Sequence, residues 1–178
     1  WTRRELLPVL GAGLAGGVLM SAQNKDDSPK KLPVIADPLF KAPPKLQQGD
    51  MIGICAPAGA LRRKEEVSEF TQILNQMGFE VKVGNNVYEK YGYFAGTDQQ
   101  RADDFNSLIK DESVKAVFFL RGGWGCARLF PLLDFDAINE NPKIIMGFSD
   151  ATSLLNAITM RLGLITYHGP NGNSTWNE

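Results

Sequence analysis

The sequence is poor in the residues that build disulfide frameworks and metal sites. Its 178 residues include two cysteines, Cys55 and Cys126, and a single histidine, His168. The cysteines lie far apart without a C-x-x-C spacing, which excludes a disulfide scaffold and a structural zinc site but leaves a single bridge open. A mechanism that needs several imidazoles cannot be built from one histidine.

Excess charge of either sign is also missing. The 19 Lys and Arg residues balance 20 Asp and Glu residues to a net charge of −1, so nothing in the charge favours a nucleic-acid partner. The sequence also lacks a glycine-rich phosphate loop that ends in Lys and Ser or Thr, and a cluster of metal ligands. We therefore predict no metal and no cofactor. The hydrophobic share of 43% is typical of a globular domain of ordinary size.

The N-terminal segment differs from the rest of the chain. Arg3 and Arg4 precede an apolar run over 8–20, and Ser21 and Ala22 follow it. Basic residues, a short apolar run and small residues are the parts of an export signal, here of the twin-arginine type. We predict a signal over 1–23 and a periplasmic or cell-envelope location. A retained anchor, a disordered tail and a cytoplasmic location are the alternatives.

The same apolar run is too short for a comfortable membrane span, so no stable span is expected after the signal is removed. Its G-x-G-x-x-G pattern over 11–16 lacks the preceding strand and the acidic residue of a dinucleotide fingerprint, and we reject that reading. Residues 24–48 are polar and rich in proline and read as a linker. The folded domain is predicted over 49–178.

In that domain, apolar β-prone runs alternate with helical patterns. Thr97 and Gln100 form a capping box at the start of one helix. Alternation at this spacing predicts an α/β fold, a parallel sheet with helices on both faces in a flavodoxin-like or Rossmann-like three-layer arrangement. The five expected strands lie at 51–56, 79–83, 115–120, 143–146 and 164–167.

Ser149 lies at the point where a predicted strand changes to a helix. Strand, sharp turn with serine, and helix are the arrangement of a nucleophile elbow, and Gly147 and Ala151 are small where the two elements must pass closely. The alternative is an ordinary helix N-cap, since serine is favoured there. Ligands of parallel sheets bind at the carboxyl ends of the strands, where four loops are expected to meet: 57–59, 121–125, 148–150 and 168–170.

Four other residues of this region carry open alternatives. Arg121 binds a substrate carboxylate or forms a salt bridge that holds its loop, and Trp124 lines a cleft or covers the loop. His168 forms a wall or a hydrogen bond, is a plain loop residue, or serves as the base for Ser149. Cys126 is read as a small buried residue rather than a nucleophile.

Five motifs in order resemble the LD-carboxypeptidases, a family of serine peptidases that includes murein tetrapeptide carboxypeptidases and microcin-immunity peptidases. The resemblance covers roughly 46–176. The motifs are Ala-Pro-Ala-Gly at 56–59, Phe-Ala-Gly-Thr-Asp at 94–98 with Arg101, Arg-Gly-Gly-Trp-Gly at 121–125, Gly-Phe-Ser-Asp at 147–150 and Tyr-His-Gly-Pro at 167–170.

This resemblance implies a reaction and roles for several residues. Ser149 is the nucleophile, and the backbone N–H groups of Gly123 (with Gly122 as the alternative) and Asp150 form the oxyanion hole. The family cleaves the amide between an L-centred diamino acid and a terminal D-alanine in murein peptides, without a metal. Its triad glutamate and histidine come from a C-terminal domain, which we expect to be absent here. The chain alone is therefore expected to be nearly inactive.

Two rival functions remain. The first is a murein-peptide binding module that is catalytically dead because the triad partners are missing. A flavodoxin-like domain that binds a nucleotide or flavin is disfavoured, because the loop at 57–59 is too short for a phosphate site. A site face without its partner domain would expose apolar surface, which predicts self-association and a possible homodimer.

Overall fold

The computed structural model describes residues 40–174 and 176. The predicted export signal and all but the end of the predicted linker lie outside the described residues. No helix in the described part of the chain is long and apolar enough to cross a bilayer.

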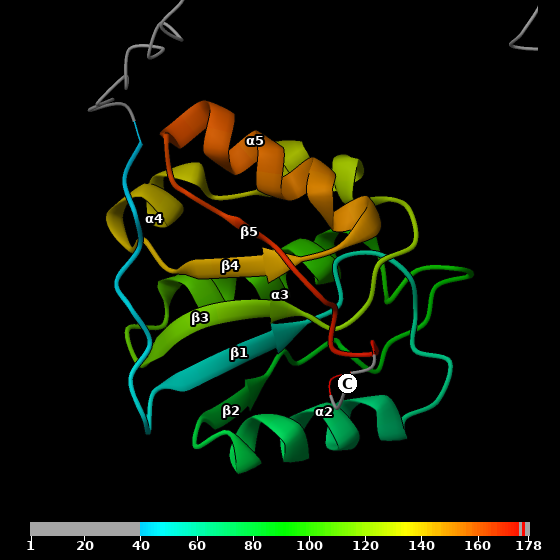
Figure 1. The fold of residues 1–178 in the computed structure, drawn as a ribbon. Coiled ribbons are helices and arrows are strands. Elements are labelled where there is room, and N and C mark those ends of the chain that lie inside the picture. The colour runs from blue at the N-terminus through cyan, green and yellow to red at the C-terminus, as the bar shows by residue number, and fades with distance from the viewer. Residues whose placement is uncertain (1–39, 175, 177–178) are drawn as a thin grey trace, which may run out of the picture. The chain divides into compact units, whose positions relative to one another are not determined.

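A parallel five-stranded sheet forms the centre of the domain (Figure 1). The strand order is β2-β1-β3-β4-β5, and every neighbouring pair is parallel. The fold class predicted from the alternating pattern is therefore confirmed. The strands are β1 (Met51–Cys55), β2 (Glu80–Val83), β3 (Val114–Phe119), β4 (Ile144–Gly147) and β5 (Tyr167–His168).

Strand β5 has two residues and begins at Tyr167, three residues after the start of the strand expected over 164–167. Leu164 forms an isolated bridge with Lys41 instead. The N–H of Lys41 donates to Gly163 O, and its carbonyl accepts from the N–H of Ile165. The last residues of the predicted linker therefore run along the domain, and Leu46 packs against its core.

Helices cover both faces of the sheet. Helix α2 lies on one face, and α3, α4 and α5 lie on the other (Figure 1). The predicted capping box is present at the start of α3, where Thr97 and Gln100 bond each other's backbone. The helices are α2 (Glu65–Gln76), α3 (Asp98–Lys110), α4 (Phe135–Glu140) and α5 (Thr152–Leu162), with short 3₁₀ segments η1 (Cys126–Leu132) and η2 (Ser149–Ala151).

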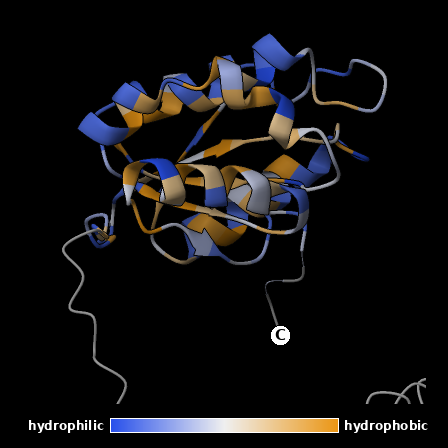
Figure 2. Ribbon diagram, turned by 90° about the horizontal axis from the view of Figure 1, so that it is seen from above, coloured by the Kyte–Doolittle hydropathy of each residue, from blue (hydrophilic) through white to orange (hydrophobic). Residues whose placement is uncertain are grey.

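Alternation along the strands divides the interior into two cores. In β3, Val117 and Phe119 face α3 and α5, whereas Ala116 and Phe118 belong to the core under α2. Figure 2 shows apolar residues concentrated between the layers and hydrophilic residues on the outer faces of the helices. Because both sheet faces are packed, the strands are held firmly and their carboxyl ends form a fixed edge.

Candidate active site

The chain turns sharply at Ser149, directly after β4. Phe148 is extended, with φ −139° and ψ 161°. Ser149 has φ +63° and is the only non-glycine residue with a positive φ in the described part of the chain. This left-handed conformation costs an L-residue about 1–2 kcal/mol, and such strain persists only where the surroundings impose it.

Gly147 makes the turn possible. A Cβ at this position would lie 2.5 Å from the ring of Phe119 and 2.8 Å from the Cβ of Ala151. Only glycine therefore lets β4 pass this close to the helix that follows. The predicted strand–turn–helix geometry of an elbow is present, and Ser149 is exposed at its tip.

The structure does not support the capping alternative for Ser149. Phe148 occupies the N-cap position of η2 and Ala151 that of α5, and neither segment has a side-chain cap. The conformation of Ser149 therefore has no explanation in helix capping.

The glycine-rich loop after β3 lies against the elbow. A Cβ on Gly122 would lie 3.1 Å from the Cβ of Ser149 and 3.1 Å from Phe148 O. Gly123 and Gly125 have φ values of +131° and +106°, which side chains rarely adopt. The structure thus brings the loop predicted to carry the oxyanion hole next to the predicted nucleophile.

Asp150 joins the elbow to the end of that loop. Its Oδ2 accepts a hydrogen bond from the N–H of Cys126 at 2.8 Å. Burial raises the pKa of the Cys126 thiol, and the nearby Asp150 carboxylate raises it further. A thiol held in its neutral form is a poor nucleophile, so Cys126 fits the structural role expected for it.

Asn171, which the sequence did not single out, binds the backbone of the elbow. Its Oδ1 accepts from the N–H of Phe148 at 2.9 Å, and its Nδ2 donates to Phe148 O at 3.3 Å. The residue is 4% exposed. In sequence it is only a polar residue in a loop after a short strand, a pattern that carries no signal of burial.

Arg101 is the second residue whose role the sequence did not reveal. Its side chain is buried, and Nη1 donates to Pro57 O and, at 3.3 Å, to Gly125 O. The guanidinium lies 4.6 Å from the centre of the Phe94 ring. Burial lowers the pKa of Arg101. One side chain thus holds the loops that follow β1 and β3.

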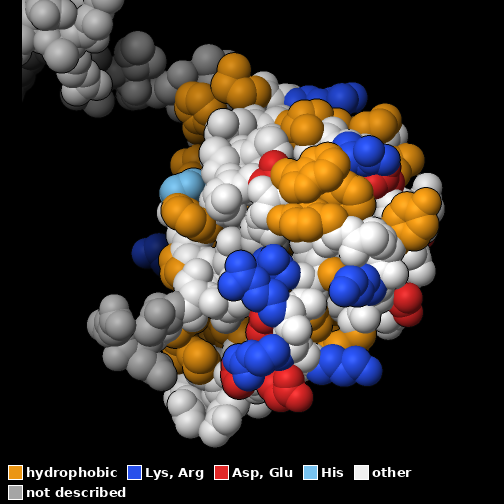
Figure 3. Space-filling model, turned by 90° about the vertical axis from the view of Figure 1, so that its right-hand side faces the viewer, with side chains coloured by type: hydrophobic (Ala, Val, Ile, Leu, Met, Phe, Trp, Pro, Cys, Tyr) orange, Lys and Arg blue, Asp and Glu red, His pale blue; other side chains and the backbone are white. Residues whose placement is uncertain are grey.

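Aromatic side chains are exposed on both sides of the elbow. Trp124 stacks on Tyr93 with ring centres 5.8 Å apart, and Phe148 packs on His168 with centres 5.1 Å apart. Figure 3, which views the carboxyl ends of the strands, shows apolar side chains gathered on this face. His168 therefore lies against Phe148 of the elbow, and no hydrogen bond joins it to Ser149 among the described residues.

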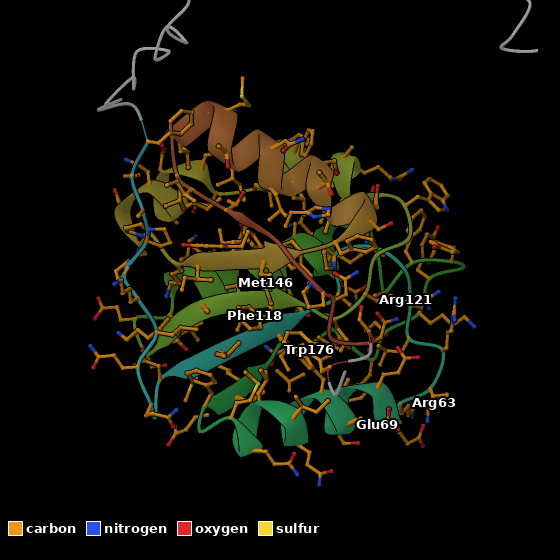
Figure 4. All side chains as sticks on the ribbon, in the orientation of Figure 1. Arg63, Glu69, Phe118, Arg121, Met146 and Trp176 are labelled. Atoms are coloured by element: carbon orange, nitrogen blue, oxygen red, sulfur yellow. The ribbon has the colours of Figure 1, made fainter. Side chains whose placement is uncertain are left out.

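Arg121 holds its loop through a backbone carbonyl rather than a salt bridge. Its Nη1 donates to Ala60 O, and its side chain points away from the sheet at the carboxyl edge (Figure 4). A cavity of about 360 Å³ lies beside it, with Arg62, Lys90 and Tyr93 also in its lining. Three basic side chains and no acidic one line this cavity, so it suits an anionic group.

The described residues contain no group of three or more His, Cys, Asp or Glu side chains that could hold a metal ion. Every sequence-predicted site residue lies at the carboxyl edge of the sheet, on the loops after β3 and β4 or in β5 itself.

Comparison with known proteins gives consistent matches. The family model described as "LD-carboxypeptidase N-terminal domain" matches residues 52–169. A Bacillus subtilis protein named "Probable murein peptide carboxypeptidase" is 38% identical over 128 residues, which cover 72% of this chain and 40% of that protein. The murein tetrapeptide carboxypeptidase of Pseudomonas aeruginosa is 37% identical over 121 residues, which cover 67% of this chain and 38% of that protein.

Solved structures match in the same way. The microcin self-immunity protein MccF, in complex with aspartyl sulfamoyl adenosine, superposes with a TM-score of 0.70 at 36% identity, covering 75% of this chain and 40% of that one. Muramoyltetrapeptide carboxypeptidase from Oxalobacter formigenes gives a TM-score of 0.64 at 27% identity, covering 72% and 42%. Another MccF structure is of an active-site mutant in which a serine, an asparagine and a lysine are each replaced by alanine. The chain spans about 40% of the length of these relatives.

Proposed function

The chain belongs to the LD-carboxypeptidase family, whose N-terminal domain matches residues 52–169, and we propose that it is the nucleophile-bearing domain of a serine peptidase acting on murein peptides. The scissile bond is the amide between an L-centred diamino acid and a terminal D-alanine. The observation that carries this proposal is the strained φ of Ser149 on an exposed turn against the loop of Gly122 and Gly123.

The proposed reaction has two steps. The Oγ of Ser149 attacks the amide carbonyl carbon and gives its proton to a base, which passes it to the leaving amine of D-alanine. Water then hydrolyses the acyl-enzyme and regenerates the serine. The N–H groups of Gly123 and Asp150 stabilise the oxyanion in both steps. Electrostatic stabilisation of this kind is usually the largest single contribution to catalysis.

The base is not assigned to this chain. His168 packs against the ring of Phe148, which supports a place in the substrate wall rather than a role in proton transfer. In the proposal, the histidine and glutamate of the triad come from outside these 178 residues. Without them the serine hydroxyl is a weak nucleophile, and the chain alone is nearly inactive.

Arg121, Gly122, Trp124 and His168 are proposed to contact the substrate. The basic cavity beside Arg121 supports binding of a free carboxylate of the peptide. The exposed ring of Trp124 provides a flat apolar surface for the rest of the substrate. The same exposed aromatic face supports covering by another domain or, in a homodimer, by a second copy of the chain.

The alternative function is a murein-peptide binding module without catalysis. It is favoured by one observation, that the single histidine, His168, packs on Phe148 and forms no hydrogen bond with Ser149 among the described residues. Both functions predict peptide binding at the carboxyl edge of the sheet, and only the first predicts turnover that depends on Ser149.

We also propose export to the cell envelope, on the basis of the twin-arginine pattern over 1–23. The test fuses residues 1–48 to a reporter that is active only after export as a folded protein. Replacement of Arg3 and Arg4 by lysine is expected to abolish the exported signal, and an unchanged signal would contradict the twin-arginine assignment.

The decisive experiment measures D-alanine release from a murein tetrapeptide. It compares this chain with the full reading frame that encodes it, each as wild type, Ser149→Ala and Ser174→Ala. Ser174 is an exposed serine of another loop and serves as the matched control. Activity of the full frame that is lost in Ser149→Ala and kept in Ser174→Ala supports the proposal. Activity that survives Ser149→Ala would overturn it, and binding without turnover in every form would favour the binding module.

A further inference from the structure

The strained conformation of Ser149 needs a restraint, and the restraint comes from another loop. Within its own segment, η2 and α5 have no side-chain cap that would fix the turn. The residue before Ser149 is instead bound on both sides of its backbone, because the N–H and the carbonyl of Phe148 both bond the side chain of Asn171.

Asn171 is itself held in place. Its carbonyl oxygen accepts from the N–H of Ser174 and from Nε1 of Trp176, each at 2.9 Å. The Trp176 ring, which Figure 4 labels, packs on Phe70 of α2 with ring centres 5.1 Å apart. Asn171, whose side chain binds the backbone of the elbow, is therefore anchored in the core on the α2 side of the sheet.

The segment that carries Asn171 also touches the end of β3. The N–H of Gly172 donates to Phe119 O at 3.0 Å, and the N–H of Asn173 donates to Leu120 O at 2.9 Å. A Cβ on Gly122 would lie 3.1 Å from Nδ2 of Asn171. The segment thus bonds both β3 and the elbow, and it sets the position of Ser149 relative to the glycine-rich loop.

The two backbone groups of Phe148 require a side chain that both accepts and donates a hydrogen bond. The N–H of Phe148 requires an acceptor and its carbonyl requires a donor, and an amide supplies both from one side chain. An ionised carboxylate only accepts hydrogen bonds. One of its oxygens would therefore face the carbonyl oxygen of Phe148, and the two would repel each other. A protonated carboxyl group has one donor and one acceptor and restores the pattern.

We propose that Asn171 is a positioning residue, which holds Ser149 in the conformation from which its Oγ attacks the substrate. This inference rests on the proposed function of Ser149. Asn171 does not touch the substrate in this scheme. A displacement of about 1 Å at a reacting atom can lower the rate about 100-fold. Loss of the Asn171 hydrogen bonds is therefore expected to lower kcat and to leave KM near its wild-type value.

The test uses the full reading frame in the form that hydrolyses a murein tetrapeptide. The variants are Asn171→Ala, the isosteric Asn171→Asp and the matched control Asn173→Ala, whose exposed side chain leaves the backbone bond to Leu120 intact. Two quantities are measured: kcat and KM for the tetrapeptide, and the rate at which a fluorophosphonate probe labels Ser149, with loss of fluoride, followed by mass spectrometry. We expect kcat and the labelling rate to fall about 10- to 100-fold in both Asn171 variants and to be unchanged in Asn173→Ala.

The pH dependence separates positioning from a loss of folding. Relative to wild type at each pH, labelling of Asn171→Asp is expected to recover as the pH falls and the introduced carboxyl group is protonated, whereas Asn171→Ala stays low throughout. The hydrogen-bond partners of Asn171 do not titrate. Asp150 and His168, the ionisable groups beside the elbow, are present in every variant, and Asn171→Ala serves as the reference for any pH dependence that they contribute.

Each outcome decides between the claims. Three results would overturn the inference about Asn171: wild-type kcat and labelling in Asn171→Ala, a rise in KM alone in that variant, or a labelling ratio of Asn171→Asp that does not change with pH. If Ser149→Ala is inactive in the same experiment, the proposed function of Ser149 still stands. Full activity in Ser149→Ala would overturn the proposed function itself.

Discussion

The guanidinium of Arg101 pairs with the carboxylate of Asp98 across the boundary of the core: the Arg101 side chain is fully buried, and that of Asp98 is 29% exposed. Arg128 binds the same carboxylate from the surface, with its side chain 55% exposed. Two arginines therefore share one acid in very different environments, which makes their contributions to stability separable.

Arg101→Met is expected to lower the free energy of unfolding by about 2–4 kcal/mol, because Pro57 O and Gly125 O lose their buried donor. Arg128→Met removes an exposed pair and is expected to cost less than about 1 kcal/mol. Urea denaturation of both variants measures the difference. Equal losses would show that the buried contacts of Arg101 contribute no more than a surface ion pair.

Site features that could be predicted from the sequence have partners close by along the chain, whereas the roles that could not be predicted depend on partners far away along the chain. The capping box joins Thr97 to a residue three positions away, and the elbow is visible because Ser149 lies at the junction of two adjacent elements. Arg101 bonds residues 44 and 24 positions away. Asn171 bonds a residue 23 positions away. Such contacts exist only once the sheet has brought its loops together.

The edge strand β5 was also difficult to predict, because its pairing depends on residues far away along the chain. The three central strands, β1, β3 and β4, lie within one residue of the apolar runs that predicted them, because a buried parallel strand is an apolar run. The edge strand β2 also lies where its alternating pattern predicted it. The run from Leu164 was expected to form a strand, yet Leu164 pairs with Lys41 from far upstream, and β5 begins at Tyr167. An edge strand has one neighbour to fix its register, so its bounds depend on the partner more than on its own residues.

Stability should fall in acid partly through Asp98. A hydrogen bond from Arg128, with the charges of Arg101 and Arg128, lowers the pKa of Asp98 from its usual 3.8. The folded state thus holds the ionised form more tightly than the unfolded state does. Its contribution is present above 3.8 and is lost as the pH falls through the lower folded value.

Asp98→Asn tests this pH dependence. The variant is expected to be less stable than wild type near neutral pH, and the gap should close in acid. Asp136→Asn, which alters an exposed carboxylate of α4, is the control and should show little gap at either pH. A gap for Asp98→Asn that is constant across the pH series would contradict the assignment.

Both cysteines should be free and unreactive in the folded protein. Cys55 and Cys126 are buried free thiols, and burial raises the pKa of each. Iodoacetamide at mildly alkaline pH is expected to add to neither in the native state and to both after unfolding in urea without reductant. Mass spectrometry counts the adducts. One adduct before unfolding would identify an accessible thiol, and none afterwards would reveal a bridge.

The last prediction concerns the conformational strain at Ser149. The hydroxyl caps neither helix, so Ser149→Ala should change the free energy of unfolding little, because alanine keeps the same left-handed strain at φ +63°. Glycine adopts that conformation freely, although it also gains freedom in the unfolded chain. Ser149→Gly is therefore expected to be more stable than Ser149→Ala by about 0.5–1 kcal/mol, as urea denaturation of the pair would measure. A site serine that lowers stability relative to glycine is retained for its hydroxyl rather than for the fold. Ser149→Gly less stable than Ser149→Ala would instead mean that the positive φ carries no strain, and the elbow would lose its main physical support.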